Sequence, residues 1–275
     1  MPLLVTNTAA RLRLGSADVA SAYLGSAQIY PDGTPASLLL RFDGNLLDSS
    51  QYGLTVTSSG NSQATASLSR IGSGSAAFPG GYDDYLIVTD SPGLDLESGD
   101  WTVEFWFRPS DVGRVGILLS INIDPNSYGQ LRLDQSNDQL VLLTYDVIGQ
   151  YWRDISAHGT LESNVWHHIA ATRSGSDFRL FLDGSLIHAY EYEYNLSQAN
   201  GYHRIGAITE GDYGTLTVSG NIDDLRIIKG LAVYTSPFTP PQSPLSPYIQ
   251  STSASPLSMF RRDELLRSIY SWSDF

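Results

Sequence analysis

The chain has 275 residues, of which 41% are hydrophobic and 16% are charged, with 25 glycines, 13 prolines and no cysteine. Its 16 basic and 29 acidic residues give a formal charge of −13, which repels phosphate backbones and anionic membrane surfaces. These figures exclude disulfides, zinc fingers and thiol catalysis, and they predict a β-rich globular protein that does not bind nucleic acid. No window approaches about eighteen consecutive apolar residues and the N-terminus lacks a signal-peptide core, so we expect neither membrane insertion nor ordinary secretion.

Residues 1–35 form a distinct segment with an approximate internal repeat. LGSADV at 14–19 is echoed by LGSAQIY at 24–30, and each copy predicts a short strand reached through a glycine turn. An isolated hairpin is only marginally stable in water. We therefore expect this arm to dock on the main domain or on another subunit.

Residues 36–240 carry a series of short apolar strands separated by polar turns. The strands are predicted at 37–42, 85–88, 101–107, 116–121, 131–134, 139–145, 167–172, 178–182, 186–192 and 222–228. No long helical period interrupts them, which excludes the crossover helices of a parallel α/β sheet. The pattern predicts an all-β fold in which two antiparallel sheets pack face to face as a sandwich or jelly roll.

Two adjacent histidines lie in this region. Strand alternation places His167 and His168 on opposite faces, so they do not chelate one metal ion together, and we interpret both as structural. Downstream, Asp183 and Gly184 provide the positive φ angles of a tight hairpin turn.

The last segment, 241–275, is a proline-rich linker followed by an amphipathic tail, and the proline-rich stretch at 236–256 predicts a linker or an extended surface wrap. Beyond it, apolar residues recur near helical spacing from Pro256 onward and predict a short amphipathic helix that is marginal alone. We expect assembly contacts from the arm and from this tail, carried by Leu14, Tyr23, Leu24, Tyr30, Phe260, Leu266, Ile269, Trp272 and Phe275.

Four sequence blocks carry a resemblance to a known family: SLLLRFDGNLLDSS, DWTVEFWFRP, NVWHHIAATRSGSDFRLFLDG and VSGNIDDLRIIKGLAVYTSPFTPP. Together they resemble the concanavalin A-like, laminin G-like jelly roll, whose members include sugar-binding modules, adhesion domains and virion proteins. Fold alone does not select among these functions. The arm, RLRLGSADVASAYLGSAQIYPDG, is similar to segments at the start of tailed-bacteriophage structural proteins.

Three kinds of site follow from the resemblance and the residues. Related glucanases use carboxylates that alternate on one strand, but the same-face neighbours of Glu104 are Thr102 and Trp106, so we expect no enzyme. A structural calcium ion is implied near the first and last strands, and its candidate ligands are Asp43, Asp48 and Asp224; the alternative is that these aspartates cap turns. Aromatic side chains suited to a sugar platform are Tyr151, Trp152, Tyr190, Tyr192 and Tyr194, although cross-strand packing or a subunit interface explains such a ladder equally well.

These observations favour a non-enzymatic phage virion protein that decorates the capsid or forms a head fibre. It would assemble in the host cytoplasm, lie on the virion surface after lysis, and form a homo-oligomer, with a trimer favoured, in contact with the major capsid protein. The alternative is a tail or fibre receptor-binding protein, or an adhesion module, that recognises a host surface glycan.

Overall fold

The computed structural model describes the backbone of residues 33–96, 99–123, 131–136, 139–146, 151–191, 202–210 and 214–249, together with short strands before residue 33. The chain divides into two compact units: Pro35–Pro247, and a second unit made of Met1–Thr34 and Tyr248–Phe275. Within the described segments, no helix has the length and hydropathy needed to cross a membrane.

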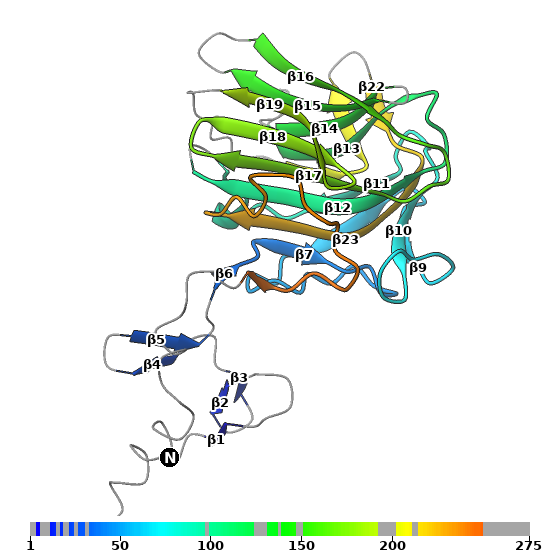
Figure 1. Ribbon diagram of the computed structural model, residues 1–275. Helices are drawn as coiled ribbons and strands as arrows, with labels where there is room; N and C mark the ends of the chain where they lie inside the picture. The colour runs from blue at the N-terminus through cyan, green and yellow to red at the C-terminus, as the bar shows by residue number, and fades with distance from the viewer. Residues whose placement is uncertain are drawn as a thin grey trace, which may run out of the picture. The chain divides into compact units, whose positions relative to one another are not determined.

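Two sheets form the larger unit (Figure 1). The first, which we call the strap-side sheet, has eight described strands, and β7 pairs with β23 beside the main order β19-β18-β17-β12-β23-β10-β9. Its strands are β7 (Leu38–Leu40), β9 (Gln63–Thr65), β10 (Ser75–Phe78), β12 (Trp101–Pro109), β17 (His167–Ser174), β18 (Asp177–Leu182), β19 (Ser185–Glu191) and β23 (Gly220–Lys229).

The second sheet has nine described strands in the main order β16-β15-β14-β13-β20-β11-β8, with β22 paired to β13 and β21 to β22. They are β8 (Val56–Ser59), β11 (Tyr85–Val88), β13 (Val115–Ile123), β14 (Leu131–Ser136), β15 (Gln139–Asp146), β16 (Tyr151–Thr160), β20 (Tyr202–Ile205), β21 (Ala207–Glu210) and β22 (Gly214–Thr217). Of the described pairings in the two sheets, the β13–β22 pairing is the parallel one. The predicted all-β, two-sheet antiparallel sandwich is confirmed.

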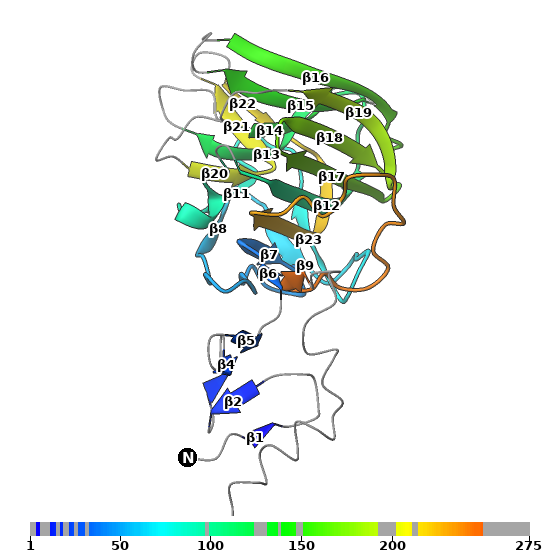
Figure 2. The same ribbon diagram turned by 60° about the vertical axis from the view of Figure 1, so that its left-hand side comes forward.

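The core lies between the sheets and follows from strand alternation. On β12, Trp101, Val103, Phe105 and Phe107 are fully buried in this core, so the intervening Thr102, Glu104 and Trp106 point to the outer face of the strap-side sheet. That outer face is also buried, because residues 231–247, which we call the strap, run across it without regular secondary structure (Figure 2).

The strap explains where the larger unit ends. It leaves β23, passes over β12 and β17, and returns until Ala36 N donates to Pro247 O at 2.8 Å. The unit thus extends past the expected boundary at residue 240, because residues 241–247 pack on the sheet as the predicted surface wrap. β6 (Thr34–Pro35) pairs with β24 (Tyr248–Ile249) in a two-stranded sheet, and the 3-10 turn η1 covers Pro92–Leu94.

The arm contains short paired strands. β1 (Leu4–Val5), β2 (Leu12–Leu14) and β3 (Ala17–Asp18) form one sheet, and β4 (Ala22–Leu24) and β5 (Ala27–Tyr30) form a hairpin. The register pairs Leu14 with Ala17 and Leu24 with Ala27. In each copy of the repeat the leucine and the alanine thus lie on two paired strands, and the Gly-Ser pair between them lies outside the described residues.

Candidate functional site

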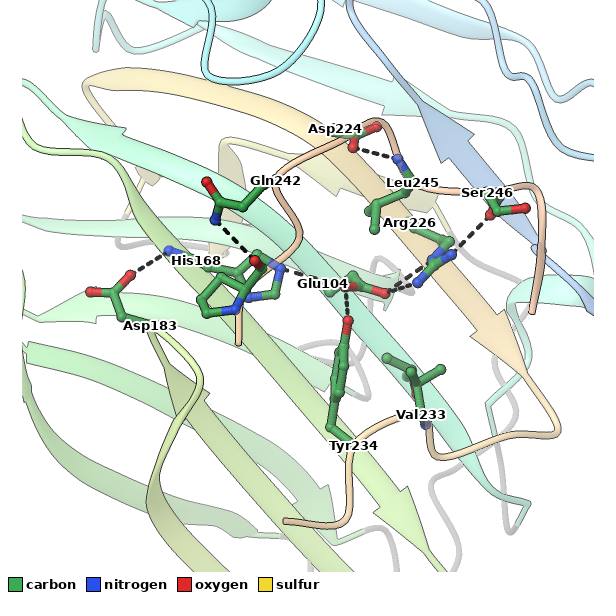
Figure 3. Close-up of polar contacts among 12 residues, drawn as sticks. Glu104, His168, Asp183, Asp224, Arg226, Val233, Tyr234, Gln242, Leu245 and Ser246 are labelled. Carbon is green, nitrogen blue, oxygen red and sulfur yellow. Dashed lines mark hydrogen bonds and ion pairs between the residues drawn. The ribbon is translucent and has the colours of Figure 1, made fainter. Parts of the chain in front are cut away.

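Glu104 is the centre of a buried polar network between the strap-side sheet and the strap (Figure 3). Its oxygen Oε1 accepts hydrogen bonds from Arg226, at 3.0 Å from Nε and more closely from Nη2. Its oxygen Oε2 accepts the Tyr234 hydroxyl at 2.7 Å and lies 3.4 Å from His168 Nε2. Both carboxylate oxygens are thus engaged, and the side chain is 0% exposed.

The electrostatics of this network keep the carboxylate ionised. Burial alone raises the pKa of Glu104, but the neighbouring His168 imidazole, the Arg226 guanidinium and the Tyr234 hydroxyl together hold it below its ordinary value. Burial and the adjacent Glu104 charge raise the pKa of the Tyr234 hydroxyl, so Tyr234 acts as a donor. A carboxylate that is buried, ionised and bonded at both oxygens holds the strap on the sheet.

The end of the strap is held by a second charged pair. Arg41 Nη2 donates to Leu245 O at 2.7 Å, and Arg41 Nη1 lies 3.7 Å from Asp224 Oδ1. Asp224 Oδ2 in turn accepts Leu245 N at 2.8 Å, and Arg226 Nη1 donates to the carbonyl oxygen of Ser246 at 2.9 Å. Two successive strap carbonyls are therefore bound by arginines that are themselves paired with buried carboxylates.

A β-bulge decides where Asp223 and Asp224 point. On β12 and β23, Glu104 pairs with Arg226 and Trp106 pairs with Asp223, so β23 has one more residue than β12 between these two pairs. Within the bulge, Asp224 adopts φ +46°. In a regular strand two adjacent aspartates would face opposite sides of the sheet, but this bulge turns both toward the outer face. Burial and the adjacent Asp224 charge raise the pKa of Asp223 to about 6, although the backbone N–H groups of Arg70 and Ile71, which donate to this carboxylate, lower it.

The two histidines take separate structural roles. His168 lies on the outer face beside Glu104, whereas His167 Nδ1 is 2.8 Å from Asp183 Oδ2 and its Nε2 accepts Glu162 N at 3.0 Å. Asp183 and Gly184 have φ of +51° and +78°, as predicted for the hairpin turn, and Asp183 also accepts His168 N. His167 therefore ties a loop to a turn, since both of its ring nitrogens are bonded.

The aspartates predicted as calcium ligands have different partners. Asp43 accepts hydrogen bonds from the backbone and hydroxyl of Ser73, and Asp48 accepts three backbone N–H groups and a hydroxyl, which is the turn-capping alternative. Asp224 contacts Leu245 and Arg41, as described above. In the described ranges no group of three or more His, Cys, Asp or Glu side chains is arranged to hold a metal ion. Calcium binding stays a prediction, and among the described residues Asp43, Asp48 and Asp224 do not form a common cluster of acidic ligands.

The aromatic residues predicted as a sugar platform are described unequally. Tyr190 is half-buried and packs against the core, in the manner of the cross-strand alternative. The side chains of Tyr151 and Trp152 on β16, and all of Tyr192 and Tyr194, lie outside the described residues. The platform therefore stays a prediction for these four.

The assembly residues also lie mostly outside the description. Only backbone is described for Leu14 on β2, Tyr23 and Leu24 on β4, and Tyr30 on β5. The tail residues Phe260, Leu266, Ile269, Trp272 and Phe275, with the predicted helix, lie outside the described residues.

Sequence reasoning missed the partners of Glu104, namely Arg226 and Tyr234. A signal for one of them was present: Glu104 and Arg226 are opposite charges inside otherwise apolar strand blocks, and a charge buried in a sheet requires a partner. Tyr234 lies in the strap, where no periodicity marks it.

Comparison with known proteins agrees with this architecture. The family model described as the concanavalin A-like lectin/glucanases superfamily, of the laminin G type, matches residues 79–232, which is more than half of the chain. No curated protein matches the sequence significantly.

Solved structures with the same fold share little sequence with the chain. The binding domain of Paraclostridial Mosquitocidal Protein 1 superposes with a TM-score of 0.57 at 16% identity, covering 72% of this chain and 50% of that one. The botulinum neurotoxin serotype D ligand binding domain in complex with N-acetylneuraminic acid gives 0.53 at 19% identity, covering 72% and 48%. The chain thus spans about half the length of these toxin domains.

A smaller neighbour is matched over nearly its whole length. Domain 4 of AbnA, a GH43 extracellular arabinanase from Geobacillus stearothermophilus, in complex with arabinotriose, gives a TM-score of 0.55 at 18% identity, covering 72% of this chain and 94% of that one. The family match and the two-sheet architecture agree, and the chain belongs to the concanavalin A-like lectin/glucanase superfamily as a laminin G-like domain.

Proposed function

We propose that this chain is a non-enzymatic binding protein of a tailed-bacteriophage virion, in which the arm and tail attach to the particle and the jelly roll is presented outward. The observation that carries the proposal is the hydrogen bond from Ala36 N to Pro247 O, at 2.8 Å. Because of it, both flanking segments leave the jelly roll at the same end, which we call the tethered pole and which is marked by Ala36 and Pro247. A domain tethered by both ends at one pole keeps the opposite pole free for contact with a partner.

The non-enzymatic part of the proposal rests on Glu104. This carboxylate is the acidic residue of the strand block that resembles glucanases, yet it lies beneath the strap with both oxygens engaged. A general acid or nucleophile has to reach the bond that it cleaves. Assays of β-glucan hydrolysis should therefore show no turnover above that of Glu104→Gln.

Particle attachment is tested by deleting residues 1–34 and measuring incorporation into purified virions. We expect the truncated chain to be absent from particles while its far-ultraviolet circular dichroism keeps the β signature of the jelly roll. Cross-linking of the full chain should capture the major capsid protein if it decorates the head, and a tail protein if it serves in adsorption. Normal incorporation of the truncated chain would refute the role of the arm.

Assembly is tested separately by light scattering coupled to size-exclusion chromatography. We expect the full chain to be a homo-oligomer, with a trimer as the first candidate, because exposed arms gain stability by burial against neighbours. A monomer at all concentrations would contradict this part of the proposal and favour a free-standing binding module.

A second candidate function is recognition of a surface glycan. It is supported by two neighbours of the same fold whose structures contain N-acetylneuraminic acid and arabinotriose. Saturable binding to an oligosaccharide array would support this function, and loss of the signal in Trp152→Ala would place it on the predicted aromatic platform. Absence of binding to any oligosaccharide would leave structural decoration as the proposed function.

A further inference from the structure

The free pole of the jelly roll is defined by the ends of β23. Lys229 N, at one end, donates to the hydroxyl of Ser37 beside the tethered pole. At the other end, Gly220 pairs with Phe78 and with Pro109. Ten residues of extended strand separate these ends by about 30 Å. The loop that follows Phe78 therefore lies at the pole opposite the tether.

This loop contains a tightly fixed turn at residues 81–84, which we call the Tyr82 turn. Asp84 is 2% exposed, and its two carboxylate oxygens accept Gly81 N and Asn61 N, both at 2.7 Å. Asp84 N donates back to Gly81 O at 3.1 Å. A Cβ on residue 81 would lie 2.8 Å from the Asp84 carboxylate, so glycine is required for this closure. The result is a short turn held from inside by a buried carboxylate.

The base of the loop is fixed as well. Arg114 Nη2 lies 3.3 Å from Gly80 O and 3.4 Å from the hydroxyl of Thr217, and the Ser219 hydroxyl donates to Pro79 O at 3.4 Å. Gly80 has φ +87°, and a side chain there would collide with Arg114. The loop is thus bonded to the neighbouring β22 and β23 segment at its base and to Asn61 at its turn.

At the tip of this turn, Tyr82 is 62% exposed and Asp83 is also exposed. An exposed tyrosine on a rigid turn offers an apolar ring face at a small cost in conformational entropy, and the adjacent carboxylate accepts hydrogen bonds from hydroxyl groups. An apolar face beside a hydroxyl acceptor matches the C–H face and the hydroxyl edge of a sugar ring. The formal charge of −13 opposes anionic ligands.

We propose that the Tyr82 turn is a binding site for neutral glycans, in which the ring of Tyr82 stacks on a sugar and Asp83 accepts its hydroxyl groups. This inference rests on the glycan-recognition function proposed above and differs from the predicted platform on β16 and β19. Preorganisation carries the affinity, because the turn is already in its bound shape before the sugar arrives.

The test uses the full chain and three variants: Tyr82→Ala, Asp83→Asn and Tyr52→Ala. Tyr52 is the matched control, because it is 46% exposed and its ring lies against Gly93, close to Ser37 at the tethered pole. The probes are an array of neutral oligosaccharides that includes arabinotriose, and N-acetylneuraminic acid as the anionic probe. Dissociation constants come from titration calorimetry, and urea midpoints check that each variant is folded.

We expect a neutral oligosaccharide to bind the wild type, with Kd raised at least tenfold by Tyr82→Ala, severalfold by Asp83→Asn, and less than twofold by Tyr52→Ala. Unchanged binding in Tyr82→Ala would overturn the site while glycan recognition stands. Binding of N-acetylneuraminic acid alone would overturn the neutral-ligand assignment. Binding of no oligosaccharide would overturn the site together with the glycan function.

Discussion

Replacing Glu104 by glutamine should destabilise the jelly roll more than any exposed substitution, because it leaves the Arg226 guanidinium buried without its counter-charge. Arg226 is 3% exposed, and Glu104 also accepts the Tyr234 hydroxyl. Breaking one partner of a buried ion pair costs about 3–5 kcal/mol, against a total stability of about 5–15 kcal/mol for a typical domain. We expect Glu104→Gln to lose a comparable free energy of unfolding.

The assay is urea unfolding of the full chain followed by tryptophan fluorescence, since Trp101 and Trp106 flank Glu104 on β12. With a urea slope of about 1–3 kcal/mol/M, the midpoint should fall by roughly 1 M or more. Glu191→Gln, at an exposed position on β19, is the control and should shift it little. The double variant with Arg226→Met should recover part of the loss, because neither partner of this ion pair is then left buried without its counter-charge.

The same pair predicts a pH dependence. Because the pKa of Glu104 is lowered in the folded state, its contribution to stability is fully present above the ordinary value of 4.5 and is lost as pH falls through the lower folded value.

Two results at neutral pH would refute the buried-pair reasoning. One is a loss of unfolding free energy below about 1 kcal/mol in Glu104→Gln, and the other is a double variant that loses as much as the two single variants together.

Three further predictions use the same unfolding assay. The pKa of Asp223 is raised from 3.8 to about 6, so ionisation of this carboxyl group should lower the free energy of unfolding by roughly 3 kcal/mol as pH rises from about 4 to 6. In Asp223→Asn this pH-dependent loss of stability should be absent. Gly184→Ala should cost at least about 2 kcal/mol more than Gly175→Ala, because both have positive φ but only at Gly184 would the new Cβ meet the Phe238 carbonyl; equal costs would contradict that contact. His167→Ala should cost about 1–3 kcal/mol because both ring nitrogens are bonded, and a neutral result would show that neither bond matters.

Local sequence patterns predicted the strands well where one face is strongly apolar. Alternation in 101–107 and 167–172 predicted both strands, the common face of Glu104 and Trp106, and the opposite faces of the two histidines, since side-chain direction in a strand depends only on position. β16 and β20 were missed because their sequences mix charged, polar and aromatic residues without an apolar face.

The sequence by itself determined the all-β class and the hairpin turn at Asp183, because each depends on residues that are neighbours along the chain. Only the tertiary structure decided that Glu104 meets Arg226 across 122 residues, that the strap covers both, and that a bulge turns Asp223 and Asp224 to one face. The physical reason is that a strand's periodicity specifies which face a side chain takes, whereas its partner depends on which strands lie side by side and what packs over them.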